Sequence, residues 1–177
     1  MEASEGRDET GEGEEMIEFS RIFSMPNKHT FEMKPAYDFI TPHIAGKKRT
    51  CDPFCGRSTL ADSRNDLAMS GVPSEEWLQS FPDESMQVVL FDPPYSPRQL
   101  KECYDSIGET LHDTKSSVWR IWKEEIARII EPNGYALSFG NNSGGIGMVN
   151  GFDIERVRLI PHGGNHYDTI CVAERKL

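Results

Sequence analysis

Residues 86–95, MQVVLFDPPY, constrain the fold more than any other stretch of the chain. The first six are mostly apolar and include two valines, a pattern typical of a buried β-strand. Pro93 and Pro94 must end that strand, because proline offers no backbone N–H to a neighbouring strand. The carbonyls of Asp92 and Pro93 are therefore left without partners in the sheet, and they can accept hydrogen bonds from another group.

Short apolar stretches alternate with helical patterns on either side of this strand. Helices are expected from Pro35 onward and over residues 97–111 and 118–130, the last one ended by the turn sequence EPNG. Further strands are expected in KKRTCDPF, RNDL, YALSFG, FDIERVRLI and HYDTICVAERK. This alternation predicts an α/β sandwich with a mostly parallel sheet and an antiparallel C-terminal hairpin at one edge.

Composition sets the domain organisation. The 177 residues suffice for one domain. Residues 1–18 carry eight acidic side chains and one arginine, so they hold −7 of the net charge of −10. We expect this segment to be a disordered acidic tail and residues 19–177 to form the folded domain, with a loop before the first helix.

The same composition bears on the location of the protein. The mean hydropathy is −0.56 and apolar runs reach only about six residues, so no membrane span is expected. The acidic N-terminus does not resemble a signal peptide. Four cysteines show neither disulfide-framework density nor zinc-ligand spacing. These features predict a cytoplasmic protein with reduced thiols and no bound metal.

The first strand–turn–strand unit is unusually short. Only seven residues separate Gly56 from Arg64. A crossover between parallel strands normally needs a dozen or more residues. The stretch RSTLADS therefore cannot hold a full crossover helix.

Five segments in this order resemble the S-adenosylmethionine-dependent amino methyltransferases of DNA: TFEMKPAYDFI, DPFCG, DPPY, EPNGYALSFG and GGNHYDT. The resemblance covers roughly residues 20 to 175. It implies a Rossmann-like methyltransferase sandwich, S-adenosylmethionine as cofactor, DNA as partner, and methyl transfer to the N6 amine of adenine. Cytosine N4 in DNA, an RNA target, or a non-catalytic methyltransferase-like subunit that binds nucleic acid are the alternatives.

The resemblance assigns a cofactor site to Lys34, Pro35, Asp52, Pro53, Phe54, Gly56 and Asp66. Asp52 can accept from an ammonium group, Gly56 allows close backbone approach, and Asp66 can accept from a ribose diol. Each acid also has a plainer interpretation, because Asp52 could cap the next turn and Asp66 could be a solvated turn residue. Where the family often has an acid for the cofactor adenine, Ser74 or a carbonyl would have to substitute.

The reacting site is assigned to Asp92, Pro93, Pro94 and Tyr95. The amine of adenine is a poor nucleophile, because its lone pair is delocalised into the ring. The Asp92 carboxylate and the Pro93 carbonyl can both accept from this amine and direct its lone pair at a methyl group, so that alignment supplies most of the acceleration. Tyr95 would stack on the base, or it could merely pack against the protein.

Nothing in the chain matches a separate target-recognition region. Only 35 residues lie between Gly56 and Asp92, and the GGNHYDT segment runs almost to the C-terminus. We therefore expect weak intrinsic sequence discrimination, a homodimer, or a separate specificity subunit. Arg98 and Lys101 could contact phosphates, or they could be ordinary surface charges.

For three other features, the sequence predicts no direct part in the reaction. Trp119 and Trp122, three residues apart, are expected in the core or at an interface. The segment NNSGGIG is expected to form a loop near the site. His162 and His166 lack a third ligand nearby in sequence, so a metal site there is not expected.

Overall fold

The computed structural model describes residues 16–106, 108 and 117–177. Within these residues one sheet is formed in the strand order β1-β6-β7-β5-β4-β2-β3. Its strands are β1 (Glu18–Arg21), β2 (Thr50–Asp52), β3 (Ser63–Arg64), β4 (Met86–Phe91), β5 (Ile130–Gly140), β6 (Phe152–Ile160) and β7 (Thr169–Lys176). The helices are α1 (Lys34–Ile44), α2 (Leu67–Ser70), α3 (Ser74–Gln79), α4 (Pro97–Ser106) and α5 (Ser117–Ile129), with 3-10 turns η1 (Thr30–Glu32) and η2 (Met148–Asn150).

The sheet is mostly parallel, as the sequence predicted. All neighbouring strands run parallel except the two pairs that include β7. The predicted antiparallel C-terminal hairpin is formed by β6 and β7, and β1 adds a parallel strand outside it. The predicted fold class is therefore confirmed.

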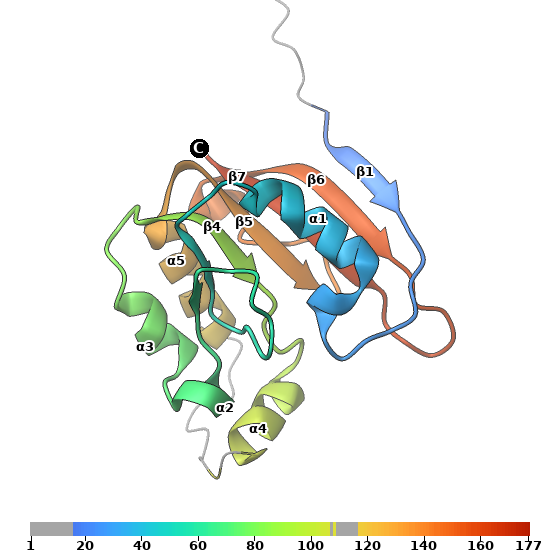
Figure 1. Cartoon of the computed structure of the whole chain (residues 1–177), viewed down its shortest axis with the longest axis horizontal. Coiled ribbons are helices and arrows are strands. Elements are labelled where there is room, and N and C mark those ends of the chain that lie inside the picture. The colour runs from blue at the N-terminus through green and yellow to red at the C-terminus, as the bar shows by residue number, and fades with distance from the viewer. Residues whose placement is uncertain (1–15, 107, 109–116) are drawn as a thin grey trace, which may run out of the picture.

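Helices cover both faces of the sheet, with α1 in front of it and α5 behind it in Figure 1. Val88 and Leu90 of β4 pack on the α1 side, whereas Val89 and Phe91 pack with α3 and α5. All four are buried, as expected for a central strand covered on both faces. Burying a side chain such as Phe39 of α1, which is fully buried, contributes roughly 1.5–3 kcal/mol.

The short connection after β2 has no helix. The backbone of residues 53–62 instead turns tightly, and Asn65, which follows the turn, binds back to its start. Its N–H donates to the carbonyl of Asp52, and its carbonyl accepts from the N–H of Cys55. The expectation that RSTLADS is not a crossover helix is confirmed.

Several boundaries differ from those expected. The strand expected at RNDL is displaced to β3, and residues 67–70 form α2. β5 begins directly after α5, so the EPNG sequence lies inside a strand in which Asn133 takes a positive φ of 64°. β1 was not predicted, and it begins at Glu18, the last residue of the expected tail. Most of that tail and the second half of the helix expected at 97–111 lie outside the described residues.

None of the helices in the described part of the chain is long and apolar enough to cross a membrane.

Candidate active site

The carboxyl ends of β2 and β4 meet at one edge of the sheet, because these neighbouring strands are parallel. β2 ends with Asp52, and Asp92 follows the last residue of β4. In open α/β sheets, ligands bind outside such strand ends. The topology thus brings the two aspartates of DPFCG and DPPY to the same side of the molecule.

In the described part of the chain, two large cavities open at this edge. The first has a volume of about 650 Å³ and lies between η1, the start of α1 and the turn after β2. The second has a volume of about 690 Å³ and extends from Asp66 and Ser74 to residues 92–95 and the loop before β7. Both are of the size that small ligands occupy. They share Lys28, Thr30, Phe54 and Asp92 in their linings, so they adjoin one another.

Asp92 lines both cavities. Burial raises the pKa of its carboxyl to about 6, and hydrogen bonds from the hydroxyls of Thr30 and Tyr95 act in the opposite direction. The Asp92 side chain is half-buried. Its carboxyl is ionised above about pH 6. A ligand in either cavity can meet the same acceptor.

Tyr95 points its hydroxyl at this carboxylate, with 2.9 Å between Oη of Tyr95 and Oδ1 of Asp92. Burial, followed by the charge of Asp92, raises the pKa of the phenol. The backbone N–H of Tyr95 donates to Oε1 of Gln99 at 2.7 Å. The tyrosine therefore stays a neutral donor, and its ring lines the second cavity.

Pro93 and Pro94 form a proline corner, and a tryptophan side chain holds this corner by a hydrogen bond. Nε1 of Trp119 donates to the carbonyl of Pro94 at 3.2 Å. The Trp119 ring packs edge-on against Trp122, which is almost fully buried. This agrees with the expected core role of both tryptophans.

Asp52 is fully buried beneath the site and lines neither cavity. Its Oδ1 accepts from the N–H of Phe54 at 3.0 Å, which is the turn-capping role named as the alternative. Its Oδ2 is buried and has no hydrogen-bond partner. Burial raises the pKa of this carboxyl to about 8, and the charges of Asp92 and Asp66 add to the effect.

Asp66 lines the second cavity and also braces the short turn. Its Oδ1 accepts from the N–H of Ala68 at the start of α2, and its Oδ2 accepts from the N–H of Gly56 at 3.1 Å. Gly56 has a positive φ of 51°, and a Cβ there would meet open space. The abbreviated turn therefore places Asp66 beside Gly56 despite the missing crossover helix.

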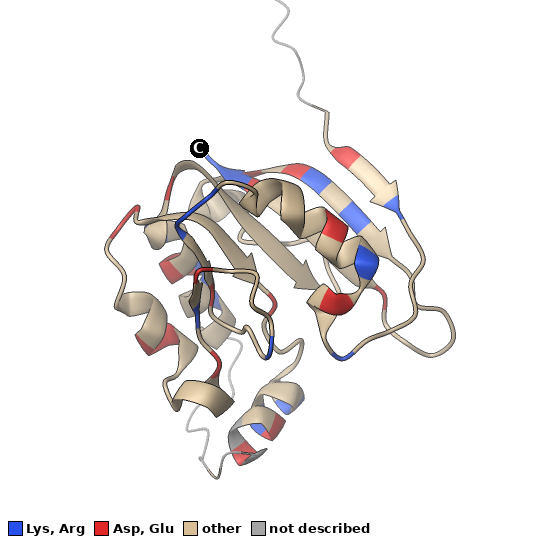
Figure 2. Ribbon diagram, viewed as in Figure 1, with Lys and Arg blue, Asp and Glu red and all other residues tan. Residues whose placement is uncertain are grey.

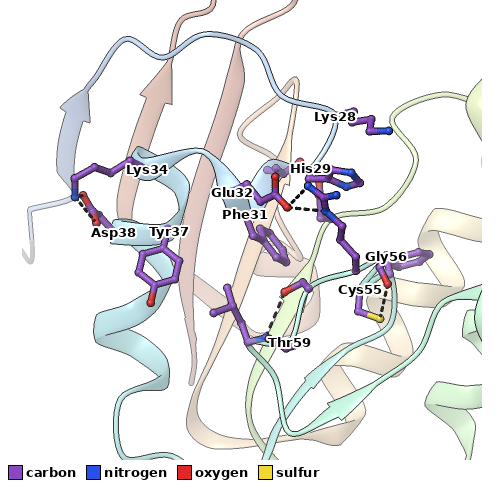
Figure 3. Close-up of a pocket in the computed structure, with 16 residues that line it drawn as sticks. Lys28, His29, Phe31, Glu32, Lys34, Tyr37, Asp38, Cys55, Gly56 and Thr59 are labelled. Carbon is purple, nitrogen blue, oxygen red and sulfur yellow. Dashed lines mark hydrogen bonds and ion pairs between the residues drawn. The ribbon is translucent and has the colours of Figure 1, made fainter.

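The first cavity is bordered by charged side chains that are mostly paired. Figure 3 shows His29, Phe31 and Glu32 of the η1 region facing Cys55 and Gly56 across the opening. Glu32 also binds Arg57 from the opposite wall, where Arg57 Nε lies 2.6 Å from Glu32 Oε1. This ion pair links the two walls.

Lys34 has an exposed side chain and pairs with Asp38 one turn later, at 2.6 Å. It lines the first cavity, whereas Pro35 does not. Pro35 is buried in the first turn of α1, and its carbonyl accepts from Arg158 at 2.9 Å.

The second cavity contains polar groups that the sequence analysis did not assign to the site. Among them, the imidazole of His162 is buried between the carbonyl of Ser24 and the hydroxyl of Thr169, both at 2.9 Å. Because a carbonyl only accepts, Nδ1 of His162 carries the proton in that bond. Tyr167, which is 85% exposed, lines the rim of the same cavity.

Ser74 is buried and lines the second cavity, and its hydroxyl donates to the carbonyl of Pro53 at 2.9 Å. Pro53 is buried and lines neither cavity. The hydrogen bond from Ser74 connects its carbonyl to the second cavity.

Eight of the expected site residues line a cavity, and three do not. Those that do are Lys34, Phe54, Gly56, Asp66, Asp92, Pro93, Pro94 and Tyr95. Pro35, Asp52 and Pro53 lie behind the walls. The residues missed by the sequence analysis include Lys28, Thr30, His162, Tyr167 and Thr169. Thr30 belongs to the TFEMKP segment, so the resemblance to the family could have indicated it. For His162, the sequence suggested only a metal site, which was not expected.

The basic side chains of the described residues lie among acidic ones rather than in a patch of their own. Figure 2 shows Lys and Arg interspersed with Asp and Glu along α1, α4 and β6. Arg98 and Lys101 of α4 each pair with an acid four residues later, Glu102 and Asp105. In the described residues, no group of His, Cys, Asp and Glu is placed to hold a metal ion.

Comparison with known proteins defines the class of fold. No protein-family model and no curated protein sequence matches the chain. Among solved structures, it is similar to 1,6-didemethyltoxoflavin-N1-methyltransferase from Burkholderia thailandensis, solved with 1,6-didemethyltoxoflavin and S-adenosylhomocysteine bound. The TM-score is 0.56 at 11% sequence identity, over 81% of this chain and 77% of that one.

A second similar structure is TrmN from Thermus thermophilus, with a TM-score of 0.50 and 15% identity. The match covers 82% of this chain and 49% of TrmN. Together with the strand order, the first likeness shows that the chain has the Rossmann-like methyltransferase fold.

Proposed function

We propose that this protein transfers a methyl group from S-adenosylmethionine to the N6 amine of adenine in DNA. The observation that carries the proposal is the position of Asp92 at the junction of two adjoining cavities. A group-transfer enzyme must hold donor and acceptor on either side of one point. A partly buried carboxylate at that point, next to a proline corner, can accept from an amine that is being methylated.

The residues of the site suit the cofactor. The first cavity, between Gly56 and Lys34, would hold its amino-acid end, and Asp66 and Ser74 would hold its nucleoside end. The buried Oδ2 of Asp52, which lacks a partner, supplies negative charge beneath the first cavity once it is ionised. When bound, S-adenosylmethionine supplies an electrophilic methyl group on a sulfonium.

The chain's own residues would orient the amine. The Asp92 carboxylate and the Pro93 carbonyl accept its two N–H groups, which keeps the nitrogen lone pair directed away from both acceptors. The Tyr95 hydroxyl and Thr30 keep Asp92 ionised near neutral pH by donating to it. The proton becomes acidic only as the new C–N bond forms, and Asp92 is then the nearest base.

The part of the second cavity between Tyr95, His162 and Tyr167 would hold the target base. A base in a duplex must leave the stack to reach it, at a cost of a few kcal/mol. Stacking on the Tyr95 ring would offset ~1–3 kcal/mol of that cost. The exposed Tyr167 ring at the rim offers a second stacking surface for a flanking base.

The proposal is tested with labelled cofactor and random-sequence DNA. The purified full chain is incubated with the cofactor and, in separate reactions, this DNA or an RNA of random sequence, and each nucleic acid is digested to nucleosides that are weighed. The expected product is N6-methyl-2′-deoxyadenosine, formed by the wild type and not by Asp92→Ala. Formation of N4-methylcytosine, or label found only in RNA, would overturn the substrate. Cofactor binding without any transfer would favour the non-catalytic alternative.

A further inference from the structure

Among the residues that the structure describes, no other strand pairs with the outer edge of β1, and this edge carries apolar side chains. Ile17, Phe19 and Phe23 are each more than half exposed, and Phe19 is 65% exposed. β1 is only four residues long and carries Glu18 and Arg21, but the stretch from Met16 to Phe23 contains no proline or lysine and β1 shows no bulge. Natural proteins usually protect a sheet edge with such features, because an open edge pairs with other strands.

The hydrogen bonds to β6 fix which backbone groups of β1 remain free. The N–H groups of Ile22 and Ser24 donate to the carbonyls of Leu159 and Pro161. Successive residues of a strand direct these groups to opposite sides, so the even-numbered residues face β6. The N–H and C=O groups of Phe19 and Arg21 consequently point outward, away from the sheet.

The side chains of the odd-numbered residues share one face of the sheet. Ser20 accepts from Arg158, whose guanidinium lies 5.5 Å from the centre of the Phe39 ring of α1. Ser20 therefore points to the α1 side, and Phe19 points to the opposite side. There Phe19 adjoins Val157 in register and Leu159 two residues on, both only partly buried.

We propose that this edge pairs with the same edge of a second copy of the chain, antiparallel about a twofold axis through Ser20. Both residues of a hydrogen-bonded antiparallel pair must point their backbone groups outward. An axis through Ser20 meets this condition and sets Phe19 opposite Arg21 of the second copy. It also sets Ile17 opposite Phe23 of the second copy.

These pairs make the edge self-complementary, as a twofold interface requires. A guanidinium beside a phenylalanine ring is a favourable cation–π pair, and Ile17 with Phe23 is an apolar pair. An axis through Arg21 would instead place two arginines opposite each other, which is destabilising. The sheet then continues across the axis, and the exposed apolar faces of both copies lie side by side.

The first test is the oligomeric state of the full chain by sedimentation equilibrium. The wild type is expected to be a dimer. Phe19→Lys places like charges opposite each other and is expected to raise the dissociation constant by about tenfold or more. Val149→Lys is the matched control, because Val149 is 95% exposed and belongs to η2, outside the sheet. A monomeric wild type, or a dimer equally affected by both changes, would overturn the proposal.

A second test locates the axis. In a Cys103→Ser background, which removes the exposed native thiol, Ser20→Cys is expected to form a disulfide-linked dimer on mild oxidation. The two residues on the axis form a non-hydrogen-bonded pair with Cα atoms about 4.5 Å apart, within the range of a disulfide. Phe19→Cys is expected to cross-link far less. Equal or reversed cross-linking would reject the axis through Ser20.

Discussion

Tyr95 and Asp92 form a hydroxyl–carboxylate pair at the junction of the two cavities, with 2.9 Å between their oxygens. The hydroxyl donates to Oδ1 of Asp92, so it stabilises the ionised form of a carboxyl whose pKa burial raises to about 6. The pair would thereby link two functions in the proposed reaction. The tyrosine would offer its ring to a base and its hydroxyl to the acceptor of the amine.

Tyr95→Phe keeps the ring and removes this hydrogen bond. The pKa of Asp92 is then expected to rise above about 6, because one of the two groups that lower it is lost. Since the proposed reaction uses the ionised carboxylate, the fall in the rate of methyl transfer at low pH should begin at a higher pH than in the wild type. Rates measured from pH 5 to pH 9 test this.

Tyr135→Phe is the control for that series. It removes a similar hydroxyl–carboxylate bond, from Tyr135 to Glu155 at 2.9 Å, and Tyr135 pairs in register with Val88, before the strand end that carries Asp92. Its pH profile should match that of the wild type. If the pH profile of Tyr95→Phe is not shifted, the fall in rate at low pH does not come from protonation of Asp92.

Asp92→Asn tests the acceptor itself with almost no change in shape. The amide keeps one oxygen that can accept from the amine, but it carries no charge and cannot take up the proton. We expect the single-turnover rate to fall by roughly 10²–10⁴, while the dissociation constant of S-adenosylhomocysteine, measured by calorimetry, changes little. A variant that loses cofactor affinity and rate together would assign Asp92 to binding instead.

The sequence predicted the parts of the site that lie on strand ends. A buried strand cannot continue through Pro93 and Pro94, and parallel neighbours end at the same edge, so Asp52 and Asp92 had to lie on one side. The short segment before Arg64 likewise excluded a crossover helix. These are local or topological constraints, and they need no knowledge of packing.

Other parts could not be derived from the sequence. β1 could not be recognised from the sequence, because its residues are mostly exposed and it pairs with β6, which lies far away in the chain. The orphaned Oδ2 of Asp52 follows from burial by the surrounding core, which no spacing rule reveals. His162 joined the site only because β6 and β7 bring their connecting loop next to the DPPY corner.

Asp52→Asn is expected to flatten the pH dependence of stability. The pKa of Asp52 is about 8 in the folded protein, against an ordinary value of 3.8. Between those values the folded state binds more protons than the unfolded state. The free energy of unfolding therefore falls as the pH rises through this window, by up to about 1.4 kcal/mol per pH unit.

The asparagine keeps the acceptor for the N–H of Phe54 but does not titrate. Urea unfolding of wild type and variant at pH 5 and pH 8 measures the difference. Asp92 contributes in the same direction below about pH 6 in both proteins. The exposed Asp153 gives the control Asp153→Asn. Parallel stability curves for wild type and Asp52→Asn would contradict the raised pKa.

Gly145→Ala should be strongly destabilising, because a buried carboxylate fills the space beside this glycine. The N–H groups of Ile146 and Gly147 donate to Glu174 at 2.6 and 2.8 Å, which anchors the NNSGGIG loop to β7. A Cβ at Gly145 would clash with the carboxylate of Glu174, and the backbone there has a φ of 45°. Backbone strain alone costs about 1–3 kcal/mol, and displacing Glu174 leaves its donors unpaired, at a further ~1–3 kcal/mol.

Gly151→Ala separates these two costs. Gly151 also has a positive φ, of 83°, but a Cβ there would meet nothing within 4 Å. It should therefore incur the backbone strain without the clash. Thermal and urea unfolding should rank wild type above Gly151→Ala, and Gly151→Ala above Gly145→Ala. Equal losses in the two variants would mean that Glu174 moves aside freely, and the loop bordering Pro93 and Tyr95 would then not depend on that carboxylate for its position.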